Sequence, residues 1–198
     1  GTPLPLVTFC VLDIETTGLN PKTCDILQFA AVLDDLKDPQ PLEKLPRFTA
    51  YFTKSVYQGE PYALGMHPGI WQKIANAQQK RIEYDGESNA HFMDIQDLPI
   101  AFQNFLSGNG VEEKYGKYKI TPAGKNAAMF DLPFLKEKIN DWGNVVFLHR
   151  VLDPAVLYFD PKTDYVLPDS KLCMERAGIA GEVAHTALED ALVVVKLI

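Results

Sequence analysis

The feature that most constrains this chain is an apolar run that ends in two carboxylates. Residues 6–12 are continuously apolar and rich in β-forming side chains, which predicts a buried strand. Asp13 and Glu15 follow with Ile14 between them, and because side chains alternate along a strand, the two acids share one face. Neighbouring carboxylates repel each other, so a pKa should rise unless a hard cation is bound. The alternative is that the two acids merely end a strand in solvent. The glycine turn at residues 16–18 favours a cation site instead, because it brings backbone N–H groups beside the two carboxylates.

A third acid opens a predicted helix. Asp131 ends the segment 126–131, which follows a predicted strand over 118–123 and begins a helix expected over 131–139. Pro133 fits the first turn of that helix, where the missing N–H costs nothing. Asp is a common N-cap residue, so capping the helix is the alternative to a role in a site.

A histidine and a fourth acid lie close together near residue 190. His185 and Asp190 are five residues apart, about 140° around a helix, so they could not face one site if both lay inside it. Thr186 and Glu189 match a capping box, which predicts Thr186 as the N-cap, His185 outside the helix and Asp190 in its first two turns. The cap therefore lets both side chains turn toward one site. The alternative for His185 is a surface histidine beside a helix end.

Hydrophobic periodicity predicts an α/β fold in a single domain over residues 1–198. The expected strands cover residues 6–12, 26–33, 48–53, 118–123 and 145–152. The expected helices lie around 70–75 and 100–106, over 131–139 and 172–177, and from 186 onward. The first three strands would form an antiparallel meander, and the segments 34–46 and 85–97 are expected to be loops. The order of the expected elements, with strands first and then helices alternating with strands, indicates one sheet covered by helices.

Composition limits the function. The chain has 19 basic and 26 acidic side chains and a net charge of −7, so it lacks the basic surface of a protein that coats nucleic acid. It suits an enzyme whose carboxylates hold metal ions. Three distant cysteines without a CxxC pair argue against a zinc site or a disulfide framework and favour a reducing, cytoplasmic location. No apolar stretch approaches the ~20 residues of a membrane span, so no membrane association is expected.

Four motifs occur in order along the chain. They are D-I-E-T-T-G at 13–18, A-L-G-M-H at 63–67, N-x-x-x-F-D at 126–131 and H-x-A-x-x-D at 185–190. Together they resemble the motifs of the DnaQ-like 3′–5′ exonucleases, the DEDDh subgroup of the ribonuclease H-like superfamily. The match at 63–67 is the softest, and it is similar to the family segment before the helix that grips the terminal nucleotide. The chain departs from the usual pattern at Lys125, where many members have histidine and a lysine could contact a phosphate, and at the extra Pro68.

The resemblance implies a fold and a site. The fold would be a five-stranded mixed sheet, a three-strand antiparallel meander plus parallel strands, flanked by helices. Asp13, Glu15 and Asp190 would hold one divalent ion, Mg²⁺ or Mn²⁺, and Asp13 would bridge to a second ion near Asp131, with His185 as the general base. The substrate contacts implied are Thr16, Thr17, Gly18, Leu64, Met66, His67 and Asn126. For Leu64 and Met66 the alternative is an ordinary helix core.

The implied activity is hydrolysis of terminal phosphodiesters at a single-stranded or frayed 3′ end, releasing nucleoside 5′-monophosphates. The sequence does not choose between DNA and RNA, and it leaves the oligomeric state open. Likeness to the DNA polymerase III epsilon subunit implies a proofreading or repair role and a polymerase partner. The alternative is a catalytically silent module of the same fold that binds nucleic acid or a polymerase, and the complete set of ligands favours the enzyme.

Overall fold

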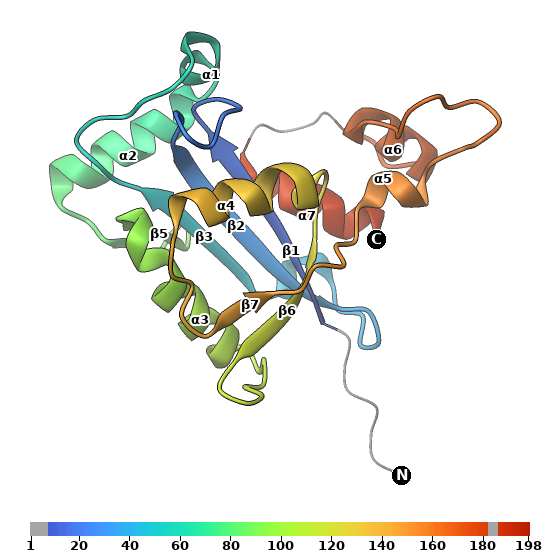
Figure 1. Ribbon diagram of the computed structural model, residues 1–198, viewed down its shortest axis with the longest axis horizontal. Coiled ribbons are helices and arrows are strands. Elements are labelled where there is room, and N and C mark those ends of the chain that lie inside the picture. The colour runs from blue at the N-terminus through green and yellow to red at the C-terminus, as the bar shows by residue number, and fades with distance from the viewer. Residues whose placement is uncertain (1–7, 182–185) are drawn as a thin grey trace.

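The computed structural model describes residues 8–181 and 186–198, and a mixed seven-stranded sheet forms its centre. The strands are β1 (Thr8–Thr16), β2 (Ile26–Asp35), β3 (Arg47–Phe52), β4 (Tyr84–Asp85), β5 (Ala90–Met93), β6 (Tyr118–Ala123) and β7 (Val145–Phe147). Their order across the sheet is β4-β5-β3-β2-β1-β6-β7 (Figure 1). β2 is antiparallel to β1 and β3, whereas β6 runs parallel to β1 and β7 parallel to β6. The predicted α/β class and the antiparallel meander are confirmed.

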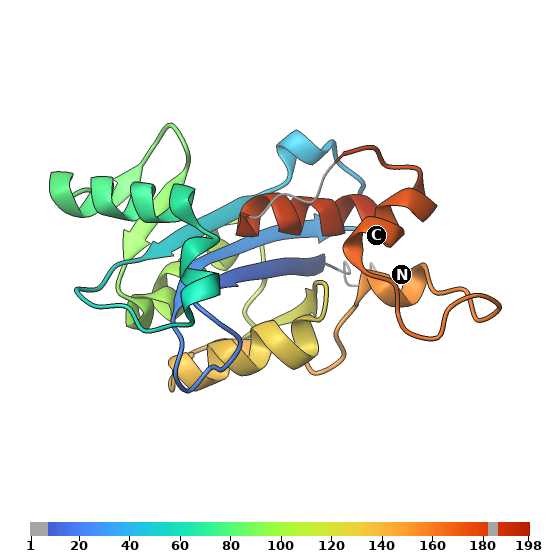
Figure 2. The same cartoon turned by 90° about the horizontal axis from the view of Figure 1, so that it is seen from above.

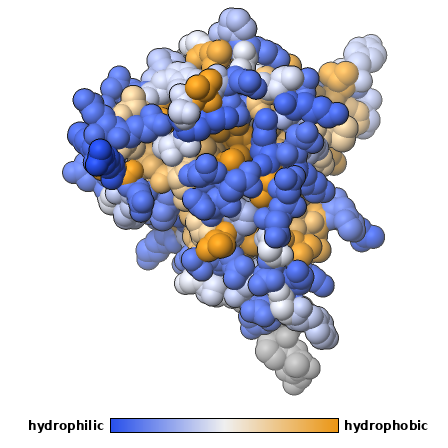
Figure 3. All heavy atoms as spheres, turned by 60° about the vertical axis from the view of Figure 1, so that its left-hand side comes forward, coloured by the Kyte–Doolittle hydropathy of each residue, from blue (hydrophilic) through white to orange (hydrophobic). Residues whose placement is uncertain are grey.

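Helices cover both faces of the sheet. They are α1 (Pro61–Gly65), α2 (Pro68–Lys80), α3 (Leu98–Gly108), α4 (Leu132–Lys138), α5 (Pro154–Leu157), α6 (Ser170–Ala177) and α7 (Ala187–Leu197), with 3-10 turns η1 (Leu42–Lys44) and η2 (Ile95–Asp97) and a π-helical turn η3 (Ala127–Asp131). Viewed from above, α2 and α7 lie on one side of the sheet and α4 on the other (Figure 2). The surface on the side of α2 is largely hydrophilic, with several separate hydrophobic patches (Figure 3). None of the helices described is long and apolar enough to cross a membrane.

The sheet has seven strands rather than the five expected. β4 and β5 overlap the segment 85–97, which was expected to be a loop; β5 pairs parallel to β3, and β4 antiparallel to β5. Ala90 and Phe92 are buried against α2 and β3. A strand of four residues is too short to reveal a period in the sequence, and its place depends on hydrogen bonds to a distant partner. The last strand is shorter than predicted, because after Phe147 the chain touches β6 only through the isolated pair Ala123 and Leu152.

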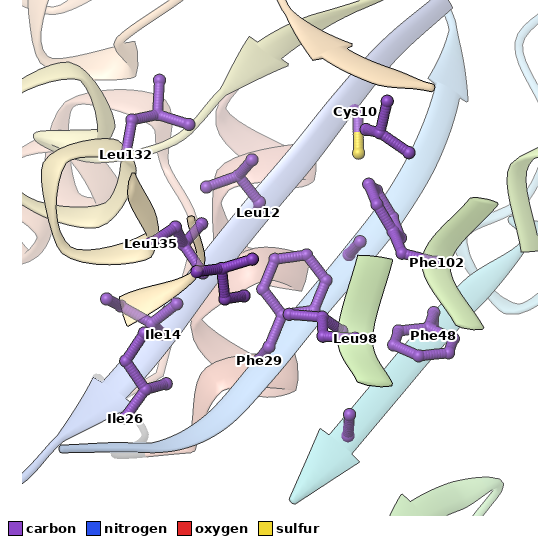
Figure 4. Close-up of a cluster of buried hydrophobic side chains, with 14 of the residues drawn as sticks. Cys10, Leu12, Ile14, Ile26, Phe29, Phe48, Leu98, Phe102, Leu132 and Leu135 are labelled. Carbon is purple, nitrogen blue, oxygen red and sulfur yellow. The ribbon is translucent and has the colours of Figure 1, made fainter. Parts of the chain in front are cut away.

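The main hydrophobic core fixes the direction of the side chains on β1. Leu12 and Ile14 point into this core, together with Phe29 of β2 (Figure 4). Phe102 of α3 packs edge-on against Phe29 with ring centroids 5.2 Å apart, and α4 adds Leu135. Because side chains alternate along a strand, Asp13 and Glu15 must point to the opposite face, which α7 covers. A one-residue slip of β1 would place carboxylates in this core, so the register is strongly specified.

Candidate active site

Three carboxylates meet at the end of β1. Asp13 and Glu15 lie on the face of the strand opposite the main core, and Asp190 approaches them from the first turns of α7. One oxygen from each of these residues can be chosen so that all three lie within 4.8 Å of one another. The structure thus brings together residues from the beginning and the end of the sequence, as the motifs predicted.

The start of α7 positions Asp190. Thr186 is the N-cap, and its hydroxyl accepts a hydrogen bond from the Glu189 N–H at 3.4 Å. The same hydroxyl lies 2.9 Å from the Glu189 carboxylate, so the two residues of the predicted capping box do contact each other. His185, the predicted general base, lies outside the described residues.

Asp131 reaches β1 from the other side, through the π-helical turn η3. It occupies the N-cap position of α4, but its side chain makes no capping hydrogen bond. The Ile14 backbone lies close enough to act on this carboxyl group, where it lowers the pKa against the larger effect of burial. The close approach of this segment requires Gly124, because a Cβ there would lie 2.7 Å from the Leu12 carbonyl oxygen. Asp131 is only 2% exposed. Its surroundings therefore favour a role in the site over the alternative of helix capping.

The electrostatics of these carboxyl groups depend on burial. Burial, and then the charges of the other three acids, raise the pKa of Asp13 well above its ordinary value. Burial is also the main cause that raises the pKa of Glu15 to about 9 and that of Asp131 to about 7. The pKa values of this pair rise as expected, but burial rather than repulsion between the two neighbours is the largest cause.

These residues fit a divalent cation. The Oδ2 atoms of Asp13 and Asp131 are buried and, among the residues described, have no hydrogen-bond donor. Buried acceptors without a donor are costly, and a cation with oxygen ligands would remove that cost. Mg²⁺ and Mn²⁺ suit such an all-oxygen set.

The turn after β1 is held rigidly by the segment before α1. Thr17 is fully buried; its N–H donates to the Asp25 carbonyl at 2.9 Å, and its carbonyl accepts from the Glu60 N–H at 2.8 Å. Gly59 packs so closely that a Cβ would lie 2.4 Å from the Thr17 side chain. The backbone of Thr17 is therefore engaged within the protein, so this residue shapes the turn.

The other two residues of the turn lie beside the acids. The Thr16 hydroxyl donates to the Gly18 carbonyl at 2.7 Å. A Cβ on Gly18 would lie 2.5 Å from the Cys24 sulfur, so no larger residue fits without a shift. Thr16 and Gly18 are both buried, which makes the turn compact.

The N-cap residue of α2, His67, lies beside one of the acids. His67 is 6% exposed, and its Nε2 lies 3.7 Å from Glu15 Oε2. Met66 is 39% exposed and Leu64 is partly buried, and neither belongs to a buried hydrophobic cluster of the described chain. The Leu64 carbonyl accepts from the Trp71 indole at 2.8 Å, which ties α1 to α2. These positions disfavour the alternative that Leu64 and Met66 are ordinary helix core.

Two residues before η3 are exposed. Asn126 has φ 52, in the left-handed region that asparagine tolerates, and its N–H donates to Asp153 Oδ2 at 3.0 Å. Lys125 precedes it on the surface. Neither is brought to the three-acid cluster by a contact in the structure, so their substrate roles stay predictions.

The sequence interpretation missed two residues that organise the site. Asp25 accepts from the Gln58 N–H at 2.8 Å and pairs with the Lys54 ammonium at 2.9 Å, which holds the segment before α1. Gln28 is 1% exposed and bonds to the start of α7. Gln28 could have been noticed as the one polar side chain inside the apolar segment 26–33.

The sheet order, the mixed strand directions and the helices on both faces define a ribonuclease H-like fold of the kind found in exonuclease domains. The zinc-bound complex of E. coli exonuclease I with single-stranded DNA matches with a TM-score of 0.57 and 17% identity, over 96% of this chain and 39% of that one. Another exonuclease I structure matches with a TM-score of 0.59 and 16% identity, over 96% of this chain and 40% of that one. Cell-death related nuclease 4 matches with a TM-score of 0.57 and 16% identity, over 98% of this chain and 62% of that one.

These matches show a shared fold at low identity. The chain spans about two fifths of the exonuclease I chains and 62% of the cell-death nuclease. No family model and no curated protein matches the sequence.

Proposed function

We propose that this chain is a metal-dependent 3′–5′ exonuclease domain of the DEDDh type. The observation that carries the proposal is the convergence of Asp13, Glu15 and Asp190 within 4.8 Å, on a fold shared with exonucleases. The raised pKa values of Asp13 and Glu15 support it, because the cluster resists full ionisation until positive charge is supplied. One domain over residues 1–198 would carry the whole site.

Two divalent ions, Mg²⁺ or Mn²⁺, would supply charge stabilisation for the attacking and leaving oxygens of a phosphodiester. Asp13, Glu15 and Asp190 would hold one of them, and Asp13 with Asp131 the other. The Oδ2 atoms of Asp13 and Asp131, buried without a donor, are the atoms that such ligation would satisfy. The Nε2 of His67 lies 3.7 Å from Glu15 Oε2 and would help to orient this carboxylate.

His185 would take the proton from the attacking water. The ordinary pKa of histidine, about 6.5, suits proton transfer near neutral pH. His185 directly precedes Thr186, the N-cap of α7, in the sequence. The reaction breaks the bond between phosphorus and the 3′ oxygen of the penultimate residue, and the released nucleotide keeps its 5′-phosphate.

The substrate would be a single-stranded or frayed 3′ end. Exonuclease I structures have been solved with single-stranded DNA and with a dA16 oligonucleotide, which supports this class of substrate. Thr16 and Gly18, in the turn fixed by Thr17, would line the terminal nucleotide. Leu64, Met66 and His67 would bound its base and sugar from the side of α1, and Asn126 would approach from η3. Apolar contacts of this kind tolerate any base sequence.

Digestion of labelled oligonucleotides tests the activity. A 5′-labelled single strand should give a ladder that shortens from its 3′ end in the presence of Mg²⁺ or Mn²⁺, and a 3′-labelled strand should release mononucleotides. Matched DNA and RNA strands, single and double, identify the preferred substrate through the 2′-hydroxyl. Asp13→Asn should be inactive, and Asp38→Asn, at an exposed acid outside the site, should match the wild type.

The same experiment separates the enzyme from a silent module. Binding of oligonucleotides without cleavage, together with no calorimetric signal for Mn²⁺, would favour a catalytically silent domain that binds nucleic acid or a polymerase. Full activity of both Asp13→Asn and His185→Ala would contradict the mechanism.

A further inference from the structure

Gln28 is a buried polar side chain that joins the sheet to α7. It lies on β2 directly opposite Glu15 of β1 and Tyr51 of β3, so the three side chains form a row on the face that carries the acids. β2 contains an extra residue at this point, because Glu15 and Thr16 pair with Gln28 and Ile26 and leave Leu27 between them. Such a bulge re-aims the side chains beside it.

Both ends of the Gln28 amide are used. Its Oε1 accepts a hydrogen bond from the Ala187 N–H at 3.0 Å, and its Nε2 donates to the Tyr51 hydroxyl at 3.3 Å. Lys73 of α2 extends the chain of contacts, with its ammonium 3.4 Å from the same hydroxyl. Gln28, Tyr51 and Ala187 are all buried, so a lost partner would leave a donor or acceptor without water.

The bond to Ala187 acts on the first turn of α7. The first N–H groups of a helix have no partner inside the helix, and Ala187 is fully buried, so water cannot replace Gln28 there. Asp190 follows within the same turn, and its N–H donates to the Thr186 carbonyl at 3.0 Å. Fixing Ala187 against β2 therefore fixes the height and rotation at which Asp190 meets Glu15.

We propose that Gln28 is a positioning residue that holds Asp190 in the geometry needed to share a divalent ion with Asp13 and Glu15. The inference rests on the proposed function and goes beyond it in assigning this role. An amide is suited to the task, because it accepts a hydrogen bond beside four carboxyl groups without adding a further negative charge. Without this bond, the turn that carries Asp190 would lose its hydrogen bond to the sheet.

Two variants, one at Gln28 and one under α7 away from it, test the role. Gln28→Leu keeps the volume and removes both hydrogen bonds, whereas Val194→Ala removes buried methyl groups under α7 further from the site and leaves the Gln28 contact intact. Amide hydrogen exchange followed by NMR should show a protection loss of about tenfold or more at Ala187 in Gln28→Leu only. Gln28→Glu should retain the protection, because a carboxylate still accepts from Ala187.

Calorimetry with Mn²⁺ then reads the site itself. The Kd for Mn²⁺ should rise about ten- to a hundredfold in Gln28→Leu and stay within about twofold in Val194→Ala. In cleavage assays kcat should fall while KM for the oligonucleotide changes little, because Gln28 is not exposed to substrate. If Gln28→Leu does not fold, Tyr51→Phe removes one end of the network and should show the same pattern with a smaller change.

The outcomes are distinguishable. A wild type that binds no Mn²⁺ would overturn the proposed function and this role with it. Two results would overturn the role of Gln28 alone, provided that the wild type binds Mn²⁺ normally. One is unchanged protection of the Ala187 amide in Gln28→Leu. The other is a Kd for Mn²⁺ in Gln28→Leu equal to that in Val194→Ala.

Discussion

The carboxylate of Asp164 and the carboxyl groups at the end of β1 have neighbours of opposite charge. Asp164 accepts from the Arg176 guanidinium, with Nη2 to Oδ1 at 2.7 Å, and from the Asp160 N–H at 2.9 Å. These bonds, with the arginine first, hold its pKa below the ordinary value. Asp13 and Glu15 face further acids, and their pKa values rise. The side chain of Arg176 supplies the cation beside Asp164, whereas on the proposed function the acids at the end of β1 would take theirs from solution.

Removing one acid of the cluster should give the largest effect. Asp13→Asn should lower the cleavage rate by about 10²–10³-fold or more, because the residue is shared by both proposed ions. The same variant should raise the Tm in chelator, since it removes a buried, repelled carboxyl. Initial rates and thermal unfolding measure the two effects. Asp164→Asn provides the contrast, with normal rates and a lower Tm; a Tm loss in both variants would contradict the comparison.

Added divalent metal should raise the Tm by binding to the acids at the end of β1, and Asp164 should contribute nothing to this rise. At 100 times its Kd, an ion that binds only the folded state adds about 2.7 kcal/mol to the free energy of unfolding. Titration of Mg²⁺ or Mn²⁺ during thermal unfolding should therefore raise the Tm of the wild type and of Asp164→Asn alike. Asp13→Asn should lose most of the shift. An equal shift in Asp13→Asn would place the ion elsewhere.

The two groups should respond oppositely to pH. In the metal-free protein the pKa of Glu15 is about 9 against an ordinary 4.5, so between these values the folded state keeps a proton that the unfolded state loses. Stability should then fall as pH rises through this window, and Asp131, with a pKa of about 7, adds to the fall. Asp164 stabilises above its ordinary pKa of 3.8, and this contribution is lost as pH falls through its lower folded pKa.

Thermal unfolding from pH 5 to 9 measures the contribution of Glu15 and Asp131, and a second series below pH 3.8 measures that of Asp164. The Tm measured in the presence of a chelator should fall as the pH rises from 5 to 9. Saturating Mg²⁺ should make this fall smaller, because metal binding displaces the protons that the carboxyl groups retain. A Tm that rises with pH in chelator would show that the carboxyls are ionised without an ion.

Breaking the ion pair at Asp164 should have the smallest effect. Arg176→Gln removes the charge from a pair that lies near the surface, where such bonds contribute little. The Tm should fall by a few degrees at most, and cleavage should be unchanged within about twofold. Loss of cleavage in this variant would connect the Asp164 segment to the site.

The comparison also shows what a sequence reveals. Asp13, Glu15 and their alternation with Leu12 and Ile14 are local, so the strand, its faces and the raised pKa could be predicted. The meander of β1, β2 and β3 followed from consecutive apolar segments.

The parts that could not be predicted depend on distant partners. β5 exists because β3 supplies hydrogen bonds to four residues with no visible period, and Gln28 matters because α7 begins above it. Asp25 likewise acts through a segment that begins near Lys54. Register and packing between remote segments decide such roles, and a local pattern does not contain them.

The contact between Gln28 and Ala187 closes a loop of 159 residues. Such contacts form late in folding, because a long stretch of chain must be ordered before they gain any stability. The acids of β1 and α7 would therefore meet only when most of the sheet is built, and the early chain would not experience their repulsion. An ion that stabilises only this finished arrangement should slow unfolding and leave the folding rate nearly unchanged. Metal would then set how long the folded protein lasts, while the sheet sets how fast it forms.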